Sequence, residues 1–159
     1  MDNLKQAGQN QIVLFALDEL RYALYLSAVE RVVRAVEITP LPEAPEIVLG
    51  VVNWQGRIIP VVDIRKRFSL PVREMDLDDR FIIARAAGRL VALAADSVTG
   101  IRGLTEQESA SAAQAAPFAE NLKGVAKVDG DLVLIYDLDR FLSLDEEKKL
   151  DAALSGAGG

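Results

Sequence analysis

Carboxylates are the side chains in this sequence that could most readily do chemistry. The candidates stand beside turns or at the ends of apolar segments: Asp63, Asp96, Asp129, Asp131, Asp137 and Asp139. Two of them within roughly 5 to 10 Å of each other could act as acid and base in a hydrolase. Structural roles compete with this, because Asp63 and Asp137 stand where helices would begin. We therefore expect no enzyme, and the hydrolase alternative fails if Asp63 and Asp137 both cap helices.

Other chemistry is limited by what the sequence lacks. The chain contains no cysteine and no histidine, so disulfides, zinc clusters and Ser-His-Asp triads are excluded. The glycines do not have the spacing of a phosphate-binding loop, and the segment around Asp129 lacks the ligand spacing of a calcium loop. We expect no cofactor and no metal.

Charge and hydropathy restrict the partners. The net charge is −6, which argues against a nucleic-acid partner because such proteins neutralise phosphates with Lys and Arg. The one basic cluster, Arg65, Lys66 and Arg67, is interpreted as a solvated helix face. No apolar stretch approaches the roughly 20 residues that span a bilayer, and residues 1–10 lack the pattern of a signal peptide. The sequence predicts a cytoplasmic protein without direct membrane insertion.

Trp54 is the single tryptophan and precedes a Gln55-Gly56 turn. It could anchor the core, or it could anchor a protein partner, since large aromatics at exposed turns often do so. Side chains alternate between the faces of a strand, so at least one of Asn53, Trp54 and Gln55 should point outward. Both interpretations of Trp54 remain open at this point.

Short strands must position these residues. Apolar and β-branched runs predict strands at 11–17, 21–26, 32–38, 51–54, 57–62, 81–85, 90–94, 97–104, 122–128 and 131–136. Hairpin turns are predicted at 18–20, 55–56, 86–89 and 129–130. Pro60 has no amide hydrogen, so its strand should lie at an edge or carry a bulge there.

Helical and irregular segments are fewer. Ser27 and Glu30 have capping-box spacing and predict one helical turn. Asp63 should cap a turn at 64–68, and Asp137 should cap one long helix over 137–154. Three prolines within 40–45 predict an extended, exposed connection, 73–79 reads as a charged loop, and 105–118 as a weakly structured surface segment. Many short strands with frequent turns predict small barrels or a sandwich.

One long pattern resembles a known family. The segment GVVNWQGRIIPVVDIR at 50–65 is similar to the pattern G-V-x-N-x-R-G-x-I-x-P-V-x-D-L-R of the CheW family. Upstream, YALYLSAVE at 22–30 resembles the early strand and helical turn of that family, and Pro45 matches the proline before its signature. Downstream, 122–142 resembles its closing hairpin and its I-x-D-L-x-x-L-L ending. The resemblance covers nearly all of residues 11–145.

The resemblance implies a fold and a role. The fold would be mainly β, with two small SH3-like five-stranded barrels packed together, short helical turns and a C-terminal helix. The domain would span 11–145, after a flexible segment 1–10 and before the helix end and frayed tail at 146–159. The role would be a non-catalytic adaptor that couples the cytoplasmic tip of a methyl-accepting chemoreceptor to the regulatory domain of a CheA-type histidine kinase. Such a protein is cytoplasmic and is recruited to membrane-associated receptor arrays.

The resemblance also implies the docking residues. By motif position, receptor contact falls on Val29, Val32, Gly50, Asn53, Trp54, Gln55 and Gly56. Kinase contact is expected at Arg31 and Val33. The family usually carries Arg where this sequence has Gln55, which loses the charge and the bidentate fork toward a carboxylate. An alternative is therefore a CheW-like array module that does not bind receptors directly.

Overall fold

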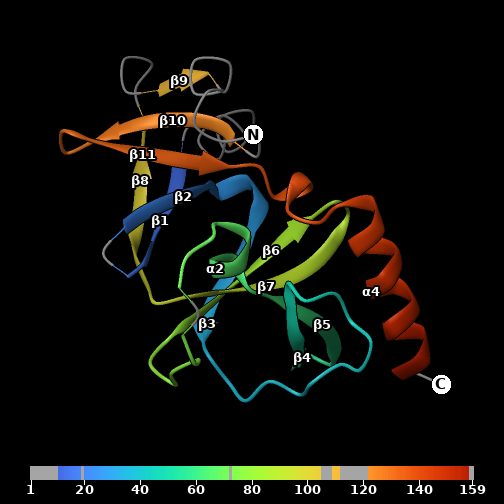
Figure 1. Cartoon of the computed structure of the whole chain (residues 1–159). Coiled ribbons are helices and arrows are strands. Elements are labelled where there is room, and N and C mark those ends of the chain that lie inside the picture. Colours follow the sequence, from blue (N-terminus) through green and yellow to red (C-terminus); the bar gives the residue numbers. More distant parts are fainter. Residues whose placement is uncertain (1–10, 19, 72, 105–108, 112–121, 158–159) are drawn as a thin grey trace.

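The computed structural model describes residues 11–18, 20–71, 73–104, 109–111 and 122–157, and these form two packed β lobes. The strands of the first lobe are β1 (Gln11–Leu17), β2 (Leu20–Tyr25), β8 (Ser97–Gly103), β9 (Ser109–Ser111), β10 (Leu122–Val128) and β11 (Asp131–Tyr136). Those of the second lobe are β3 (Val29–Arg34), β4 (Val48–Trp54), β5 (Arg57–Val62), β6 (Arg80–Ala86) and β7 (Arg89–Ala95). The chain thus leaves the first lobe after β2 and returns to it at β8 (Figure 1).

Each lobe is one sheet built mainly from hairpins. The first sheet has the order β8-β1-β2-β11-β10-β9 and the second the order β3-β6-β7-β5-β4. The β1–β2, β4–β5, β6–β7 and β10–β11 pairs are antiparallel, while β11–β2 and β5–β7 are parallel. All four predicted hairpins are therefore confirmed. They could be predicted from the sequence because a hairpin depends on alternating apolar residues and on turn residues with positive φ, which are all close together in the chain.

Three apolar clusters explain why the central strands are apolar on both faces. In β6, Phe81 and Ile83 face a core inside the second lobe, and Ile82 and Ala84 face a core shared by the two lobes. A third cluster fills the first lobe. It contains Ile12 of β1 together with residues of β2, β10 and β11. Because strand residues alternate between faces, one strand contributes to two cores. The shared core holds the lobes together.

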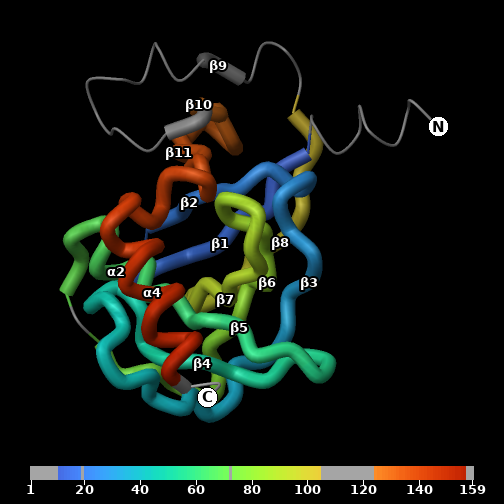
Figure 2. The backbone as a smooth tube through the Cα atoms, turned by 90° about the vertical axis from the view of Figure 1, so that its right-hand side faces the viewer, coloured from blue at the N-terminus to red at the C-terminus, as the bar shows by residue number. Residues whose placement is uncertain are grey.

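The C-terminal segment differs from the single helix predicted over 137–154. Asp137 caps only a short 3-10 helix, η2 (Leu138–Arg140), and the α-helix α4 (Leu144–Ala157) begins later. Ser143 caps α4, since its Oγ accepts from the Glu146 amide at 3.1 Å and Glu146 Oε1 accepts from the Ser143 amide at 2.8 Å. The prediction of one helix is wrong because the segment between η2 and α4 is drawn into the shared core, where Phe141 is buried. Figure 2 shows α4 lying along the second lobe.

The capping box predicted at Ser27 is also wrong. The turn there is a 3-10 helix, η1 (Leu26–Ala28), without a side-chain cap. Glu30 already lies in β3, where its carboxylate accepts a hydrogen bond from Arg85 of β6 at 3.0 Å. Only three residues separate β2 from β3, so the chain re-enters a sheet before a full α-turn can form.

Pro60 neither lies in an edge strand nor carries a bulge. β5 is an interior strand, and the bulge is on β4, where the register shifts between Val48 and Gly50. Val51, opposite Pro60, exchanges both backbone hydrogen bonds with Thr39, at 2.9 and 2.8 Å. The parallel ladder with β7 covers only Val61 and Val62. The prediction that Pro60 requires an edge strand or a bulge at its own position is therefore wrong. The interior strand β5 accommodates a residue that has no amide hydrogen.

The connection after β3 is less exposed than its prolines suggested. Leu41 and Pro45 are buried, and Leu41 belongs to the shared core. By contrast, 73–79 is a loop with several exposed charges, as predicted. The predicted surface segment 105–118 and the predicted flexible segment 1–10 lie mostly or wholly outside the described residues.

Candidate protein-docking site

The β4–β5 turn exposes three polar or small positions at the end of a hairpin. Gln55 and Gly56 both have positive φ, 52° and 80°, as a two-residue hairpin turn of type I′ requires. Asn53 Oδ1 accepts a hydrogen bond from the Gly56 amide at 3.1 Å, which closes the turn. Asn53, Gln55 and Gly56 are all exposed. The expectation that at least one residue here points outward is confirmed.

Trp54 combines features of the two roles considered for it, an anchor in the core and an anchor for a protein partner. The side chain is half-buried and packs against the second-lobe core, which contains Val52 and Ile59. Its partner across the hairpin is Arg57, at the start of β5. Trp54 therefore anchors the turn to the lobe and still leaves part of its ring at the surface.

The other predicted contact residues lie on β3. Arg31 is exposed, Val32 is 37% exposed, and Val33 is half-buried against the second-lobe core. Val29 is half-buried against the shared core. β3 and β4 are the two end strands of the second sheet, so the predicted residues fall on two separate edges. The connector after β3 links these edges, because Thr39 forms a bridge with Val51 of β4.

Gly50 is a special case among the predicted receptor contacts, because it is buried. A Cβ at this position would lie 2.3 Å from the Thr39 carbonyl oxygen and 2.6 Å from Ile38 Cγ2. The absence of a side chain thus allows the connector to pack directly on β4. Gly50 thus supports the edge strand β4 from inside.

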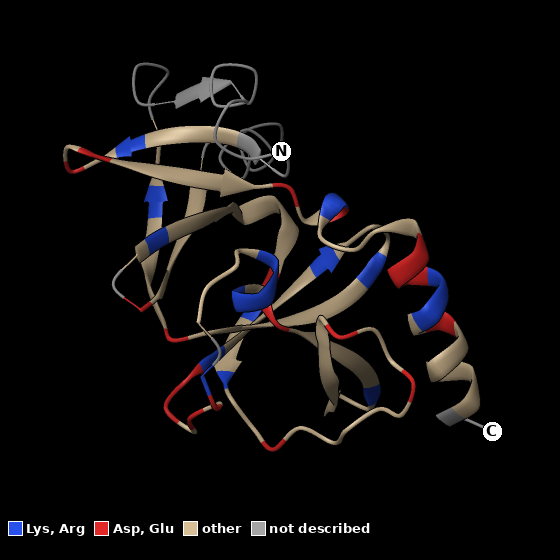
Figure 3. Ribbon diagram, viewed as in Figure 1, with Lys and Arg blue, Asp and Glu red and all other residues tan. Residues whose placement is uncertain are grey.

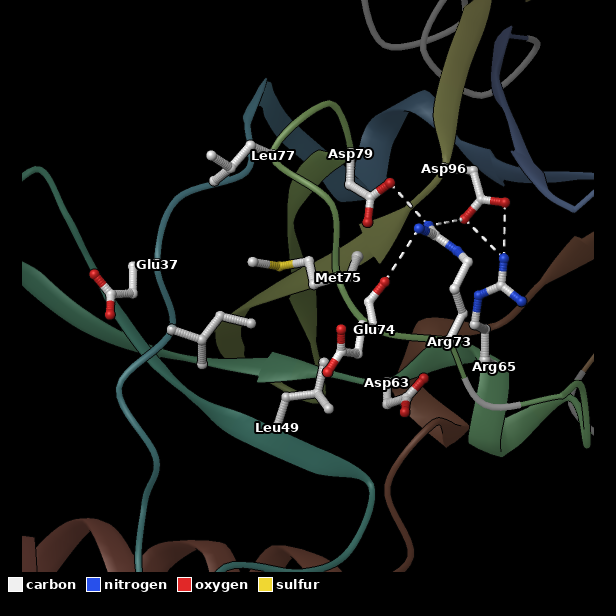
Figure 4. A pocket seen from close by; sticks show the side chains of 12 residues that line it. Glu37, Leu49, Asp63, Arg65, Arg73, Glu74, Met75, Leu77, Asp79 and Asp96 are labelled. Atoms are coloured by element: carbon white, nitrogen blue, oxygen red, sulfur yellow. Dashed lines mark hydrogen bonds and ion pairs between the residues drawn. The ribbon is translucent and has the colours of Figure 1, made fainter.

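An ion cluster joins the two lobes, and the sequence analysis missed it. Arg65 donates to Asp18 of the β1–β2 turn at 3.1 and 2.9 Å and to Asp96 at 2.9 and 2.7 Å. Arg73 adds ion pairs to Asp79 at 2.8 Å and to Asp96 at 2.6 Å. We call these five residues the inter-lobe ion cluster (Figure 4, which shows four of them). Arg65 comes from α2 (Ile64–Arg67) of the second lobe and Asp18 from the first.

The prediction of a solvated basic helix face at Arg65, Lys66 and Arg67 is therefore wrong for two of the three residues. The Arg65 side chain is only 8% exposed, and Arg67 pairs with Glu146 of α4 at 2.5 Å. Lys66 alone is exposed. The partners of Arg65 lie 47 and 31 residues away, so no local pattern could identify them.

Electrostatics within the cluster favour its charged forms. Burial alone would raise the pKa of Asp96, but hydrogen bonds from Arg65, the Asp18 amide and Arg73 outweigh it and lower that pKa. The hydrogen bond to Asp18 is the largest influence on Arg65 and raises its pKa, although burial opposes this. Arg65 and Asp96 thus stabilise each other's charged form.

The carboxylates proposed for hydrolysis have other partners. Asp63 accepts from the Lys66 amide and caps α2, and Asp137 accepts from the Asp139 amide and caps η2. Asp129 and Asp131 pair with Arg21. The hydrolase alternative thus fails by its own condition. Among the described residues no group of acidic side chains could hold a metal ion, and no helix there could cross a membrane.

Fold and site together define a class. The chain offers two packed β lobes, edge strands and an exposed hairpin turn with a half-buried aromatic, which are features of a protein-binding scaffold.

Comparisons with known proteins identify the family. A family model described as a CheW-like domain matches residues 11–146. The chemotaxis protein CheW of Thermotoga maritima is 31% identical over 132 residues, which cover 83% of this chain and 87% of that protein. CheW of Rhizobium meliloti is 25% identical over 143 residues, covering 89% and 92%.

A solved structure agrees. The scaffolding protein TtCheW from Thermoanaerobacter tengcongensis superposes with a TM-score of 0.77 at 31% identity, covering 87% of this chain and 95% of that one. The chain belongs to the CheW family and has the role of a chemotaxis adaptor or scaffold. The predicted mainly β fold of two packed SH3-like lobes with a C-terminal helix is confirmed.

Proposed function

We propose that this adaptor couples the cytoplasmic tip of a methyl-accepting chemoreceptor to the regulatory domain of a CheA-type histidine kinase. The observation that carries the proposal is the CheW-like match across residues 11–146. The protein works without chemistry of its own, in the cytoplasm, at receptor arrays beneath the membrane. The assigned residues occupy both edge strands of the second sheet, with the kinase residues on β3 and most of the receptor residues on β4 and its turn.

Receptor contact is assigned to Val29, Val32, Gly50, Asn53, Trp54, Gln55 and Gly56. The exposed β4–β5 turn supports this, because its backbone is fixed by the Asn53 hydrogen bond before any partner arrives. A preformed turn loses little conformational entropy on binding. Trp54 provides partly exposed apolar area, and Gly50 holds the edge in place from inside.

Kinase contact is assigned to Arg31 and Val33. Arg31 is exposed on the edge strand β3, where a guanidinium can reach a partner carboxylate. Val33 is half-buried, so it sets the position of the strand more than it offers area. The paired Arg85 and Glu30, on β6 and β3, lie beside this edge.

Gln55 keeps the second candidate function in view. Where the family usually has Arg, Gln can donate and accept hydrogen bonds but cannot form a charged fork. A CheW-like array module that binds the kinase but no receptor would have this property.

A capture experiment separates the two functions. The full chain is immobilised and exposed to the kinase regulatory domain, to a receptor tip, and to both together. Capture of both partners supports coupling and shows that Gln55 replaces Arg adequately. Capture of the kinase domain alone supports the array module, and capture of neither contradicts both functions.

Gly56→Leu tests the turn itself, with Gly88→Leu as a matched control. Gly56 and Gly88 are both hairpin-turn glycines, with φ of 80° and 84°. At each, no heavy atom lies within 4 Å of the position that a Cβ would occupy. Each substitution should destabilise the fold by about 1 to 2 kcal/mol, the penalty for a side chain at positive φ. Only Gly56→Leu should abolish receptor capture. Unchanged capture by a folded Gly56→Leu protein would contradict the receptor-site assignment.

A further inference from the structure

A cavity of about 560 Å³ opens on the second lobe, apart from the residues assigned to receptor and kinase. It lies between β4, the connector after β3, the start of α2 and the loop 73–79 (Figure 4). Its apolar lining comes from Ile38, Leu49, Met75, Leu77 and Ala94. None of the nine residues proposed above for docking lines it.

Two leucines of this lining are left uncovered. Leu77 is 71% exposed and Leu49 is 38% exposed. Leu49 lies at the bulge of the edge strand β4, where the register shifts between Val48 and Gly50. Bulges re-aim side chains at sheet edges and next to binding sites. The bulge is what presents Leu49 to the cavity rather than to a regular face of the sheet.

The cavity is also acidic, with five carboxylates and two arginines in its lining. Both arginines, Arg65 and Arg73, are already held by carboxylates of the inter-lobe ion cluster. Glu37 and Glu74 have no ion-pair partner within the part of the chain that the structure describes. Figure 3 shows acidic positions on both segments that carry them, the connector and the loop. The cavity therefore attracts cations and repels anions.

Asp63 provides a specific acceptor inside the cavity. Its side chain is buried, at 9% exposure, and lines the cavity. Oδ1 accepts from the Lys66 amide at 3.4 Å, while Oδ2 has no partner among the described residues. Oδ2 is therefore an acceptor left open to a charged N–H donor from outside.

We infer that this cavity is a docking site for a partner-protein segment that presents an apolar side chain next to Lys or Arg. The apolar side chain covers Leu49 and Leu77, and the cationic group is attracted by Asp63, Glu74 and Glu37. Acidic segments and nucleic acids are repelled by the same carboxylates. The site adds a third contact to the proposed adaptor and does not depend on receptor or kinase binding.

Two synthetic peptides test the inference on the full ¹⁵N-labelled chain. Capped Gly-Lys-Leu-Lys-Gly should shift the amide resonances of Leu49, Met75 and Leu77. It should bind at least about tenfold more tightly than Gly-Glu-Leu-Glu-Gly, since two exposed attractions become two repulsions. Raised salt should weaken this binding. Equal binding of both peptides, shifts located elsewhere, or no shifts at all would overturn the proposal.

Paired charge reversals sharpen the test. Glu37→Lys with Glu74→Lys should reverse the peptide preference. Glu43→Lys with Glu46→Lys changes net charge equally at exposed positions that do not line the cavity, and it should preserve the preference. An identical response of the two double variants would show general charge attraction and overturn the site. Receptor and kinase capture is measured separately, so failure here is distinguishable from failure of the coupling function.

Discussion

The inter-lobe ion cluster and the β4–β5 turn are both polar, yet the rest of the molecule holds them very differently. Arg65 is 8% exposed on its side chain and is bound by two carboxylates from separate parts of the chain. Gln55 is exposed at the tip of a hairpin, and the side-chain contact that closes the turn is a local hydrogen bond from the Gly56 amide to Asn53. One region connects lobes, and the other is free to meet a partner.

This difference distinguishes a region that maintains the fold from a region that can contact a partner. A buried arginine must keep its partners, because an uncompensated charge inside the protein is costly. An exposed turn residue can change with little effect on folding, so selection for a partner can act on it. The departure from the family pattern at Gln55 falls where the structure tolerates change.

Arg65→Ala should show the largest effect. It removes the group that neutralises Asp18 and Asp96, and we expect a loss of about 3 kcal/mol in the free energy of unfolding. Urea unfolding measures it. Gln55→Ala is the comparison from the exposed region and should change stability by less than about 0.5 kcal/mol. Equal effects of the two substitutions would remove the distinction drawn between the regions.

Gly50→Ala should have an intermediate effect and sharpen the comparison within one hairpin. The new Cβ would meet the Thr39 carbonyl oxygen at 2.3 Å, so backbone must move. We expect a loss of about 2 kcal/mol, the usual range for overpacking. Gly56→Ala meets no atom within 4 Å and should cost about 1 kcal/mol for its positive φ alone. A smaller loss at Gly50 than at Gly56 would contradict the packing role of Gly50.

Lowering the pH should weaken the inter-lobe ion cluster. Of the three predicted effects on stability, we expect this one to be the smallest. The pKa of Asp96 is lower in the folded chain than its ordinary value of 3.8. The stabilisation is therefore present above about pH 4 and is lost as the pH falls through the folded pKa. The stability difference between the wild type and Asp96→Asn should shrink between about pH 5 and pH 3. A difference that stays constant over that range would show that ionised Asp96 contributes nothing.

Prediction from sequence succeeded where the forces are local. The hairpins at Gln55-Gly56 and Asp129-Gly130 follow from turn residues with positive φ, and Asp63 caps α2 as expected. The residues proposed for receptor contact come from motif position, and Asn53, Gln55 and Gly56 among them are exposed. The long helix failed because burial of Phe141 in the shared core interrupts it, which no helical periodicity reveals.

The sequence by itself determined the order of strands and turns, the lack of His and Cys chemistry, and the family pattern, because each depends on neighbouring residues or on composition. Only the tertiary structure decided which of three adjacent basic residues is buried and how an acidic, partly apolar cavity forms on the second lobe. Both depend on groups from distant segments, such as Asp18 and Asp96 around Arg65. Charge and hydropathy along the chain do not specify which distant groups meet, since packing of the two lobes brings them together.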